Sequence, residues 1–325
     1  TNVFAEDQDI TVASGGTLHV KTGSQSVDTI TNSGIVNLDD DLTVRVLTNN
    51  LDAEFNQDAN ITSIDAIMNG DWNVTGNRIL NTTTLTGNAT VSLAEYLKIN
   101  QSGTSQFDGS ISGNGKLEKT GNGALSISDA QTFAGGLDVT GGTFQTLSGG
   151  TLNDSLDIHV FKDSTFIAGA VDTVGSVLVD AKGTGSSAGR FDMNANITTQ
   201  GDFENNGQLN LNANLTTANT DSSTSTYGDF INNGTTTLAS DRTITTAGGL
   251  IGTTTGIINV NNLGTDLTLN QTGNTTYSGT IVGVGSFIKT GNGNLTLNGV
   301  ANSIDLGTTD SSTGTLVNAG TLTTA

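Results

Sequence analysis

The chain has 325 residues, of which 43 are Gly, none is Pro or Cys, and only 5% are aromatic. Its 31 acidic and 11 basic residues give a formal net charge of −20, which argues against binding to nucleic acid or direct adsorption to anionic lipids. Without Cys there are no disulfides or thiolate metal sites, and no apolar run approaches the roughly 18 residues that span a bilayer.

Short units that join a Gly or Asn turn to an alternating strand recur along the chain. Asn and Gly accept the positive φ of tight corners, and alternation of apolar and polar residues predicts strands. Gly207 and Gly234 hold the same place in two such units and are 27 positions apart, which is too long for a hairpin and fits one coil of a solenoid. The units lie at 14–20, 31–38, 140–144, 204–211, 231–238 and 318–322.

A longer repeat has a constant offset of 170 positions. The segment 107–127 returns as 277–297, and Asn100-Gln-Ser-Gly corresponds to Asn270-Gln-Thr-Gly upstream. Chance similarity between low-complexity segments rarely keeps its register over such a length, so we interpret the match as true repetition.

These patterns predict an all-β fold, a right-handed parallel β-helix that forms a single continuous domain over residues 1–325. We expect about 20 to 27 residues per coil and roughly 12 to 16 coils. Main-chain ladders, small aliphatic stacks and corner rows of Asn or Thr would hold the coils together. The most helix-like stretch, 92–99, is too short to organise a domain. Because the sequence stops at Ala325 within a repeat-like unit, we expect a fragment of a longer polypeptide.

Candidate metal ligands are few. Asp39-Asp40-Asp41, with Asp28 or Asp52 nearby, could bind Ca²⁺, but without a recognisable loop motif a solvated acidic turn is the favoured interpretation, and calorimetry would test it. His19 and His159 are the only histidines. Both flank apolar strand residues, so alternation turns both imidazoles outward.

Three segments match enzyme motifs by letter. Asn219-Thr-Asp221 resembles an element of polygalacturonases, but its partner carboxylates and His are missing. Gly185-Ser-Ser-Ala-Gly189 matches Gly-x-Ser-x-Gly, but no helical pattern follows. Gly-Asn-Gly at Gly121 and Gly291 lacks the helix and Lys-Ser/Thr of a phosphate loop. Loops and strand corners are favoured in all three, and we expect no catalytic, cofactor or metal site.

Aromatic side chains are too scarce for an extended sugar-stacking platform, so we expect core filling or end-capping. The residues in question are Trp72, Tyr96, Tyr227, Tyr277 and scattered Phe. Two Ser/Thr/Gly-rich stretches, 181–189 and 219–227, are the expected excursions from the β-helix and the first places to look for contacts.

The two long segments resemble the passenger-associated strand repeat of autotransporters, and the texture of the chain is similar to rickettsial-type surface antigens. The second copy departs downstream, where 298–306 lacks the Gly-Gly corner found at Gly135 and Gly136. The resemblance rests on Gly113, Gly115, Leu117, Lys119, Gly121, Gly123, Leu125 and Ile127, and on Gly283, Gly285, Phe287, Lys289, Gly291, Gly293, Leu295 and Leu297.

What the resemblance implies is an exported passenger region on the surface of a Gram-negative bacterium, with the β-barrel translocator outside this chain. The leading hypothesis is a non-catalytic structural or adhesive rod that mediates adhesion or aggregation. Its partners would be a receptor or glycan on a host or neighbouring cell, with self-association as a further option. A self-assembling surface-layer or fibre subunit is the first alternative, and a glycan-active β-helix hydrolase or lyase is the second.

Overall fold

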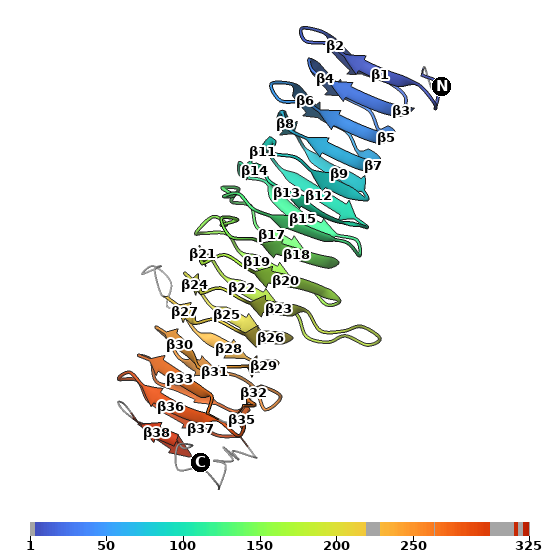
Figure 1. Cartoon of the computed structure of the whole chain (residues 1–325). Coiled ribbons are helices and arrows are strands. Elements are labelled where there is room, and N and C mark those ends of the chain that lie inside the picture. The colour runs from blue at the N-terminus through green and yellow to red at the C-terminus, as the bar shows by residue number, and fades with distance from the viewer. Residues whose placement is uncertain (1–3, 219–227, 263, 300–314, 318–320, 325) are drawn as a thin grey trace. The chain divides into compact units, whose positions relative to one another are not determined.

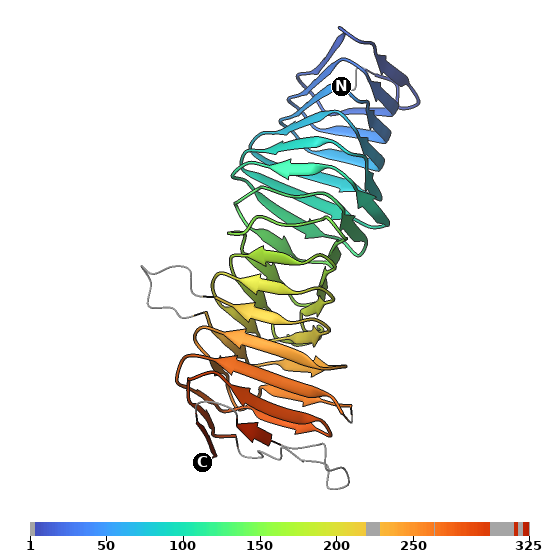
Figure 2. The same ribbon diagram turned by 60° about the vertical axis from the view of Figure 1, so that its left-hand side comes forward.

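The computed structural model describes residues 4–218, 228–262, 264–299, 315–317 and 321–324. The chain divides into two compact units, residues 1–156 and residues 157–325. Both consist of short parallel strands, and each strand pairs with its counterpart in a neighbouring coil (Figures 1 and 2). The described residues contain no helix, and hence none long and apolar enough to cross a bilayer.

In the first unit, strands of successive coils stack into three sheets. The first contains β1 (Asp9–Val12), β3 (Gln25–Asn32), β5 (Leu42–Asn49), β7 (Ile61–Met68), β9 (Asn77–Thr82), β12 (Tyr96–Gln101), β15 (Lys116–Thr120) and β17 (Leu137–Val139), with β10 (Thr84–Thr86) beside β7. The second contains β2 (Thr17–Val20), β4 (Ile35–Leu38), β6 (Glu54–Gln57), β8 (Asp71–Val74), β11 (Thr90–Leu93) and β14 (Ser110–Ser112). The third contains β13 (Thr104–Phe107), β16 (Ala124–Ile127) and β18 (Gly142–Thr146).

The second unit is built in the same way. One face contains β19 (Ile158–Val160), β22 (Val177–Val179), β25 (Phe203–Asn205), β28 (Phe230–Asn232) and β31 (Leu250–Ile251). Another contains β20 (Ser164–Ala168), β23 (Arg190–Met193), β26 (Gln208–Leu211), β29 (Thr235–Leu238), β32 (Ile257–Val260) and β35 (Thr280–Gly283). A third contains β21 (Asp172–Val174), β24 (Ile197–Thr199), β27 (Leu215–Thr217), β30 (Arg242–Thr246), β33 (Asp266–Gln271), β36 (Ser286–Thr290) and β38 (Thr315–Val317). Strands β34 (Thr275–Tyr277), β37 (Leu295–Leu297) and β39 (Leu322–Thr324) form a small sheet.

The predicted all-β, parallel β-helical fold is confirmed, with about 14 coils. Coil length varies more than predicted. Asn32 and Asn49 hold equivalent places only 17 positions apart, whereas Asn205 and Asn232 are 27 apart. The stretch 92–99 belongs to β11, a turn and β12 rather than to a helix. The grouping of all residues into one domain stays a prediction.

The core is a thin stack of alternate side chains from the strands. In β12 and β15, Leu97, Ile99 and Leu117 point inward and are completely buried. In the second unit four phenylalanines stack in sequence, with ring centroids separated by 4.8, 5.3 and 6.1 Å. Each such pair stabilises the stack by roughly 0.5–1.5 kcal/mol beyond the burial of its area. The four rings are those of Phe166, Phe191, Phe203 and Phe230.

Asn side chains join successive coils at a corner, as the sequence predicts, and also on an outer sheet face, which was not predicted. Inside the first unit, the amide of Asn32 donates to Oδ1 of Asn49 at 2.7 Å. On the outer face of β4, β6 and β8, Asn73 donates to Asn56 and Asn56 donates to Asn37, both at 2.8 Å. Each row repeats one hydrogen bond per coil, so it favours a single register between coils.

Many strands end in a buried polar side chain that donates to a main-chain carbonyl two residues on. Gln101 donates to the carbonyl of Gly103 and Gln271 to that of Gly273, both at 2.9 Å. A buried carbonyl without a donor is costly, so these side chains stabilise the corners at which the chain changes direction. The same pattern occurs at Gln57, Thr82 and Thr199.

The two copies of the long repeat fold into two coils that have the same arrangement of strands. Strand β36 begins and ends 170 positions after β15, and β35 and β37 follow β14 and β16 at nearly the same offset. The buried residues also correspond: Phe107 and Tyr277 are each no more than 1% exposed. The repetition inferred from the sequence is therefore also a repetition of structure.

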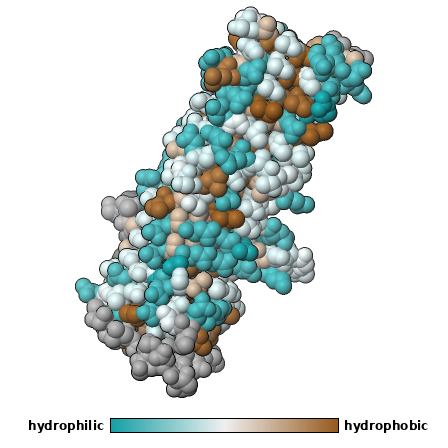
Figure 3. All heavy atoms as spheres, in the orientation of Figure 1, coloured by the Kyte–Doolittle hydropathy of each residue, from teal (hydrophilic) through white to brown (hydrophobic). Residues whose placement is uncertain are grey.

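The outer surface is mostly hydrophilic or neutral, and hydrophobic atoms gather over the N-terminal coils on the face shown in Figure 3. Among the large apolar side chains, Leu51 is 70% exposed and Ile64 is 51% exposed. Isolated exposed residues are normal on soluble proteins, whereas contiguous patches mark interaction surfaces.

Candidate functional site

The acidic turn of residues 39–41 lies between β4 and β5, and its three carboxylates face different donors. Asp40 accepts a hydrogen bond from the main chain of Gly23 at 2.7 Å, and Asp41 accepts one from the main chain of Asn60 at 3.0 Å. Asp28 instead pairs with both Nε and an Nη of Arg45, which holds the pKa of that carboxyl below its usual range.

These carboxylates therefore do not converge. Asp52 lies in a separate turn, with its backbone at a φ of 65°. In the described part of the chain, no group of three or more His, Asp or Glu side chains is arranged to hold a metal ion. A calcium ion usually takes six to eight oxygen ligands, and the calcium site at residues 39–41 stays a hypothesis that calorimetry would test.

Both histidines face outward, as strand alternation predicts, and each pairs with an Asp one coil later. His19 in β2 lies 2.7 Å from Asp39, and His159 in β19 lies 2.9 Å from Asp180. Both pairs are partly exposed side-chain contacts on the sheet surface. They can bridge coils, and pairs of this kind contribute little to stability, about 0–1 kcal/mol.

The loop of residues 180–189 joins β22 to β23 and stands out from the coils in Figure 1. The main chain of Ser187 donates to Asp163, and Gly189 donates to the carbonyl of Asp180. The element that follows is strand β23, so Gly185-Ser-Ser-Ala-Gly189 does not form a nucleophile elbow, which requires a following helix. The other expected excursion, 219–227, lies outside the described residues, as does the Asn219-Thr-Asp221 tripeptide.

The large aromatic side chains fill the core. Trp72 and Tyr277 are 1% and 0% exposed, and the indole of Trp72 donates to Gln57 at 3.0 Å. Burial raises the pKa of Tyr277 above its usual value. Tyr96 is half-buried on the outer face of β12, where its hydroxyl donates to Glu118. Core filling is thus confirmed for Trp72 and Tyr277.

A carboxyl group with a raised pKa lies at a corner of the second unit and was not predicted. Burial, together with the neighbouring carboxylate of Asp202, raises the pKa of Asp229 to about 6. The main-chain N–H of Asp229 donates to Asp202 at 2.8 Å, which keeps the two residues adjacent. Asp229 lines a groove of about 500 Å³ with Gly248, Thr272, Gly273, Asn274 and Thr275.

A carboxyl with a raised pKa beside a second carboxylate is a feature of glycoside-cleaving sites. The side chains around it are already engaged: Thr272 donates to the carbonyl of Ala247, and Asn274 accepts from the main chain of Asn294. The signal in the sequence would have been the Asp before β25 and again before β28, 27 positions apart.

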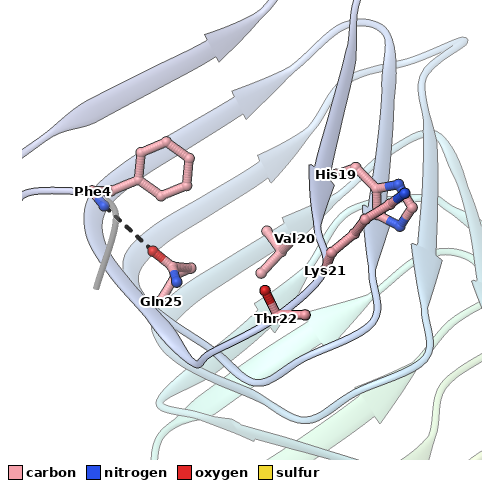
Figure 4. Close-up of a pocket in the computed structure, with 6 residues that line it drawn as sticks. All are labelled: Phe4, His19, Val20, Lys21, Thr22 and Gln25. Carbon is pink, nitrogen blue, oxygen red and sulfur yellow. Dashed lines mark hydrogen bonds between the residues drawn. The ribbon is translucent and has the colours of Figure 1, made fainter. Parts of the chain in front are cut away.

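A smaller cavity of about 180 Å³ lies in the N-terminal coil (Figure 4). Phe4 lies over one side of it, and its main-chain N–H donates to Oε1 of Gln25 at 3.3 Å. His19 and Lys21 lie on the opposite side, at the end of β2. The cavity has no convergent set of catalytic groups, and Phe4 has the place expected of a partial end cap.

Comparison with known proteins gave no match to a family model, a curated protein or a solved structure. Any function assigned to the chain therefore rests on its own fold and on the geometry of its coils.

Proposed function

We propose that the chain is a non-catalytic structural and adhesive scaffold on the surface of a Gram-negative bacterium, where it mediates adhesion or aggregation. The observation that carries the proposal is the structural equivalence of the two motif copies, β14–β16 and β35–β37. The motif that resembles the passenger repeat builds complete coils with their own buried core and corners. Such coils can be added to a scaffold without a catalytic site.

The outer faces support the same proposal. In the first unit, β4, β6 and β8 present a row of short polar side chains, Asn37, Asn56 and Asn73. Amide and hydroxyl groups in a regular row can form many weak hydrogen bonds to a glycan or a protein surface, and loops such as 181–189 add variable contacts. The expected partners are a receptor or glycan on another cell.

Adhesion can be tested with beads coated with the purified chain and incubated with epithelial cells and with a glycan array. We expect attachment that soluble chain competes away, together with clumping of coated beads if the chain mediates aggregation. A matched variant in which a short Gly-Ser link replaces residues 182–188 tests the loop. If the coated beads neither attach to cells nor clump more than albumin-coated beads do, the proposal is wrong.

Self-assembly into a layer or fibre is the second candidate, and the exposed apolar side chains of the N-terminal coils favour it. Ile64 and Leu51 each expose apolar surface, which a neighbouring copy could bury. Sedimentation velocity over a range of concentrations separates the candidates, because assembly predicts growth with concentration and a monomeric adhesin does not. The variant I64T, on an outward position of β7, should reduce such growth.

A further inference from the structure

Two lysines at equivalent positions of the motif are buried without a carboxylate partner. Lys119 and Lys289 lie 170 positions apart, and both have 0% of their surface exposed. Within the described residues no carboxylate oxygen lies within 4.0 Å of either ammonium group. A buried charge is costly unless other groups compensate it, so the surroundings of these ammonium groups require an explanation.

Main-chain carbonyl oxygens provide the compensation. The Nζ atom of Lys119 donates to carbonyls of its own corner and of the next coil, and Nζ of Lys289 donates to two carbonyls of the equivalent corner. The distances for Lys119 are 2.8 Å to Thr120, 3.3 Å to Gly121, 2.9 Å to Gly123 and 3.3 Å to Gly141. Those for Lys289 are 2.5 Å to Thr290 and 3.2 Å to Gly291.

The glycines fix the corner in this shape. Gly121 and Gly291 have φ values of 78° and 76°, which other residues rarely adopt. A Cβ atom on Gly123 would lie 2.0 Å from the carbonyl oxygen of Gly103 in the coil before. The carbonyls are therefore held toward the interior by the close stacking of two corners and not by the lysine alone.

The coil before each motif shows how a neutral donor serves a comparable corner. There the amide of Gln101 donates to two carbonyls and to the hydroxyl of Ser105. Gln271 does the same with two carbonyls and Thr275. The corner of Lys119 presents four carbonyls and no hydroxyl, an oxygen-only environment that suits a cation better than an amide.

We propose that the Gly-Asn-Gly corner of each motif copy is a monovalent-cation site made of main-chain carbonyl oxygens, which the chain occupies with the tethered ammonium of Lys119 or Lys289. A ring of carbonyl dipoles replaces the hydration shell of a potassium-sized ion, and an ammonium ion is of similar size and charge. Although burial lowers the pKa of Lys119 to about 8, the group remains mostly charged at pH 7. The lysine side chain itself is therefore the cation that occupies the corner.

Chemical rescue tests the proposal. The variant K119A removes the ammonium and leaves the carbonyls, so we expect its Tm to fall by about 5 °C or more. Ammonium or methylammonium chloride should raise the Tm of K119A part of the way back, and the rise should saturate with salt concentration. Methylammonium should be the more effective, because it also fills space left by the side chain. Tetramethylammonium is too large to enter and should not restore it.

Lys116 provides the matched control, because it lies on the same strand but points outward to Asp138. K116A and the wild type should respond equally to all three salts at equal ionic strength. An equal response of K119A to ammonium and tetramethylammonium would overturn the proposal.

If K119A does not fold, the wild-type chain labelled with ¹⁵N at lysine Nζ gives an independent answer by NMR. We expect two of its seven lysines to show ammonium protons that exchange slowly with water, and one of these signals to be absent in K119Q. Rapid exchange at all lysines would contradict a carbonyl cage around Lys119 and Lys289. Adhesion does not enter either experiment, so the result is separate from the proposed function.

Discussion

The side-chain amide of Asn205 donates a 2.9 Å hydrogen bond to the amide oxygen of Asn232, its counterpart one coil later. Asn232 in turn donates to the hydroxyl of Tyr277 and to the carbonyl of Ile257, and its oxygen also accepts from Thr236. Both Asn residues are completely buried. Both polar atoms of the Asn232 side chain are thus used, and the network joins residues of five strands, β25, β28, β29, β32 and β34.

Removing this amide should destabilise the second unit. N232A leaves buried donors and acceptors of several residues without partners, and we expect a loss of about 3 kcal/mol in the free energy of unfolding. Urea denaturation followed by circular dichroism measures it. The adjacent N233A is the control: Asn233 is half-buried and bonds to Asn206 on the outer face, so its loss should stay below about 1 kcal/mol. Equal effects of the two substitutions would count against the network.

Stability should rise with pH between about 8 and 10. Burial lowers the folded-state pKa of Lys119 to about 8, below its ordinary 10.5, and lowers that of Lys289 as well. In this window the unfolded chain binds more protons than the folded chain, so the free energy of unfolding increases with pH. Above about pH 10 the buried Tyr277 acts in the opposite direction, since its pKa is raised and only the unfolded chain ionises there.

Urea midpoints at pH 7, 8, 9 and 9.5 give the slope directly. The double variant K119M/K289M keeps side chains of similar length without a titrating group, so its midpoint should be flat over the same range. A wild-type midpoint that falls between pH 8 and 9.5 would show that the folded-state pKa values are not lowered.

The carboxyl of Asp229 should change the stability of the folded chain in mild acid. Its folded-state pKa of about 6 lies above the ordinary 3.8, so the folded chain takes up a proton first and this group adds stability as the pH falls from about 6 to 4. Carboxyls with lowered pKa, such as Asp28 and Asp108, act in the opposite sense. The quantity to measure is therefore the difference in the free energy of unfolding between the wild type and D229N at each pH. We expect D229N to be the more stable at pH 7 and the difference to shrink toward pH 4. A pH-independent difference would argue against a raised pKa.

Limited trypsin digestion should cut first after Lys182. This lysine is exposed in the loop 180–189, whereas Lys119 and Lys289 are fully buried in strands. Exposed loops rich in small residues are preferred sites of proteolysis. Mass spectrometry should find complementary products 1–182 and 183–325 early in the digest, and K182Q should delay them. Early cleavage after Lys119 would contradict its placement in the core.

The sequence was sufficient to predict the fold because local and global signals agree. Gly and Asn mark the corners, alternation marks the strands, and the 170-residue repeat fixes which strands are equivalent. The outward placement of His19 and His159 followed from the same alternation, whereas core filling by Trp72 was expected because aromatic residues are scarce. The short coils of 17 residues were not predicted, because repeat units of unequal length are hard to align within low-complexity sequence.

The chemistry of the interior was harder to predict. Lys119 and Lys289 were identified as motif positions, and strand alternation sets them on the same side as Leu117 and Phe287. Their burial was still not predicted, because lysine is almost never fully buried. Their carbonyl partners lie in the corner that follows each lysine and, for Lys119, also at Gly141 in the corner of the next coil. Asp229 was missed for a related reason: its raised pKa depends on burial and on Asp202, which is near in space but 27 positions distant in the chain.

Unequal coil length has a consequence for diversification. Neighbouring coils keep their parallel pairing whether 17 or 27 residues separate equivalent positions. In the second unit, the hydroxyl of Thr217 donates to the carbonyl of Gly228 at 2.6 Å, although the two residues are 11 positions apart in the chain. Insertions and substitutions can therefore accumulate at the corners while the interior is unchanged, and a foreign peptide grafted between Gly183 and Ser187 should leave the surrounding coils folded.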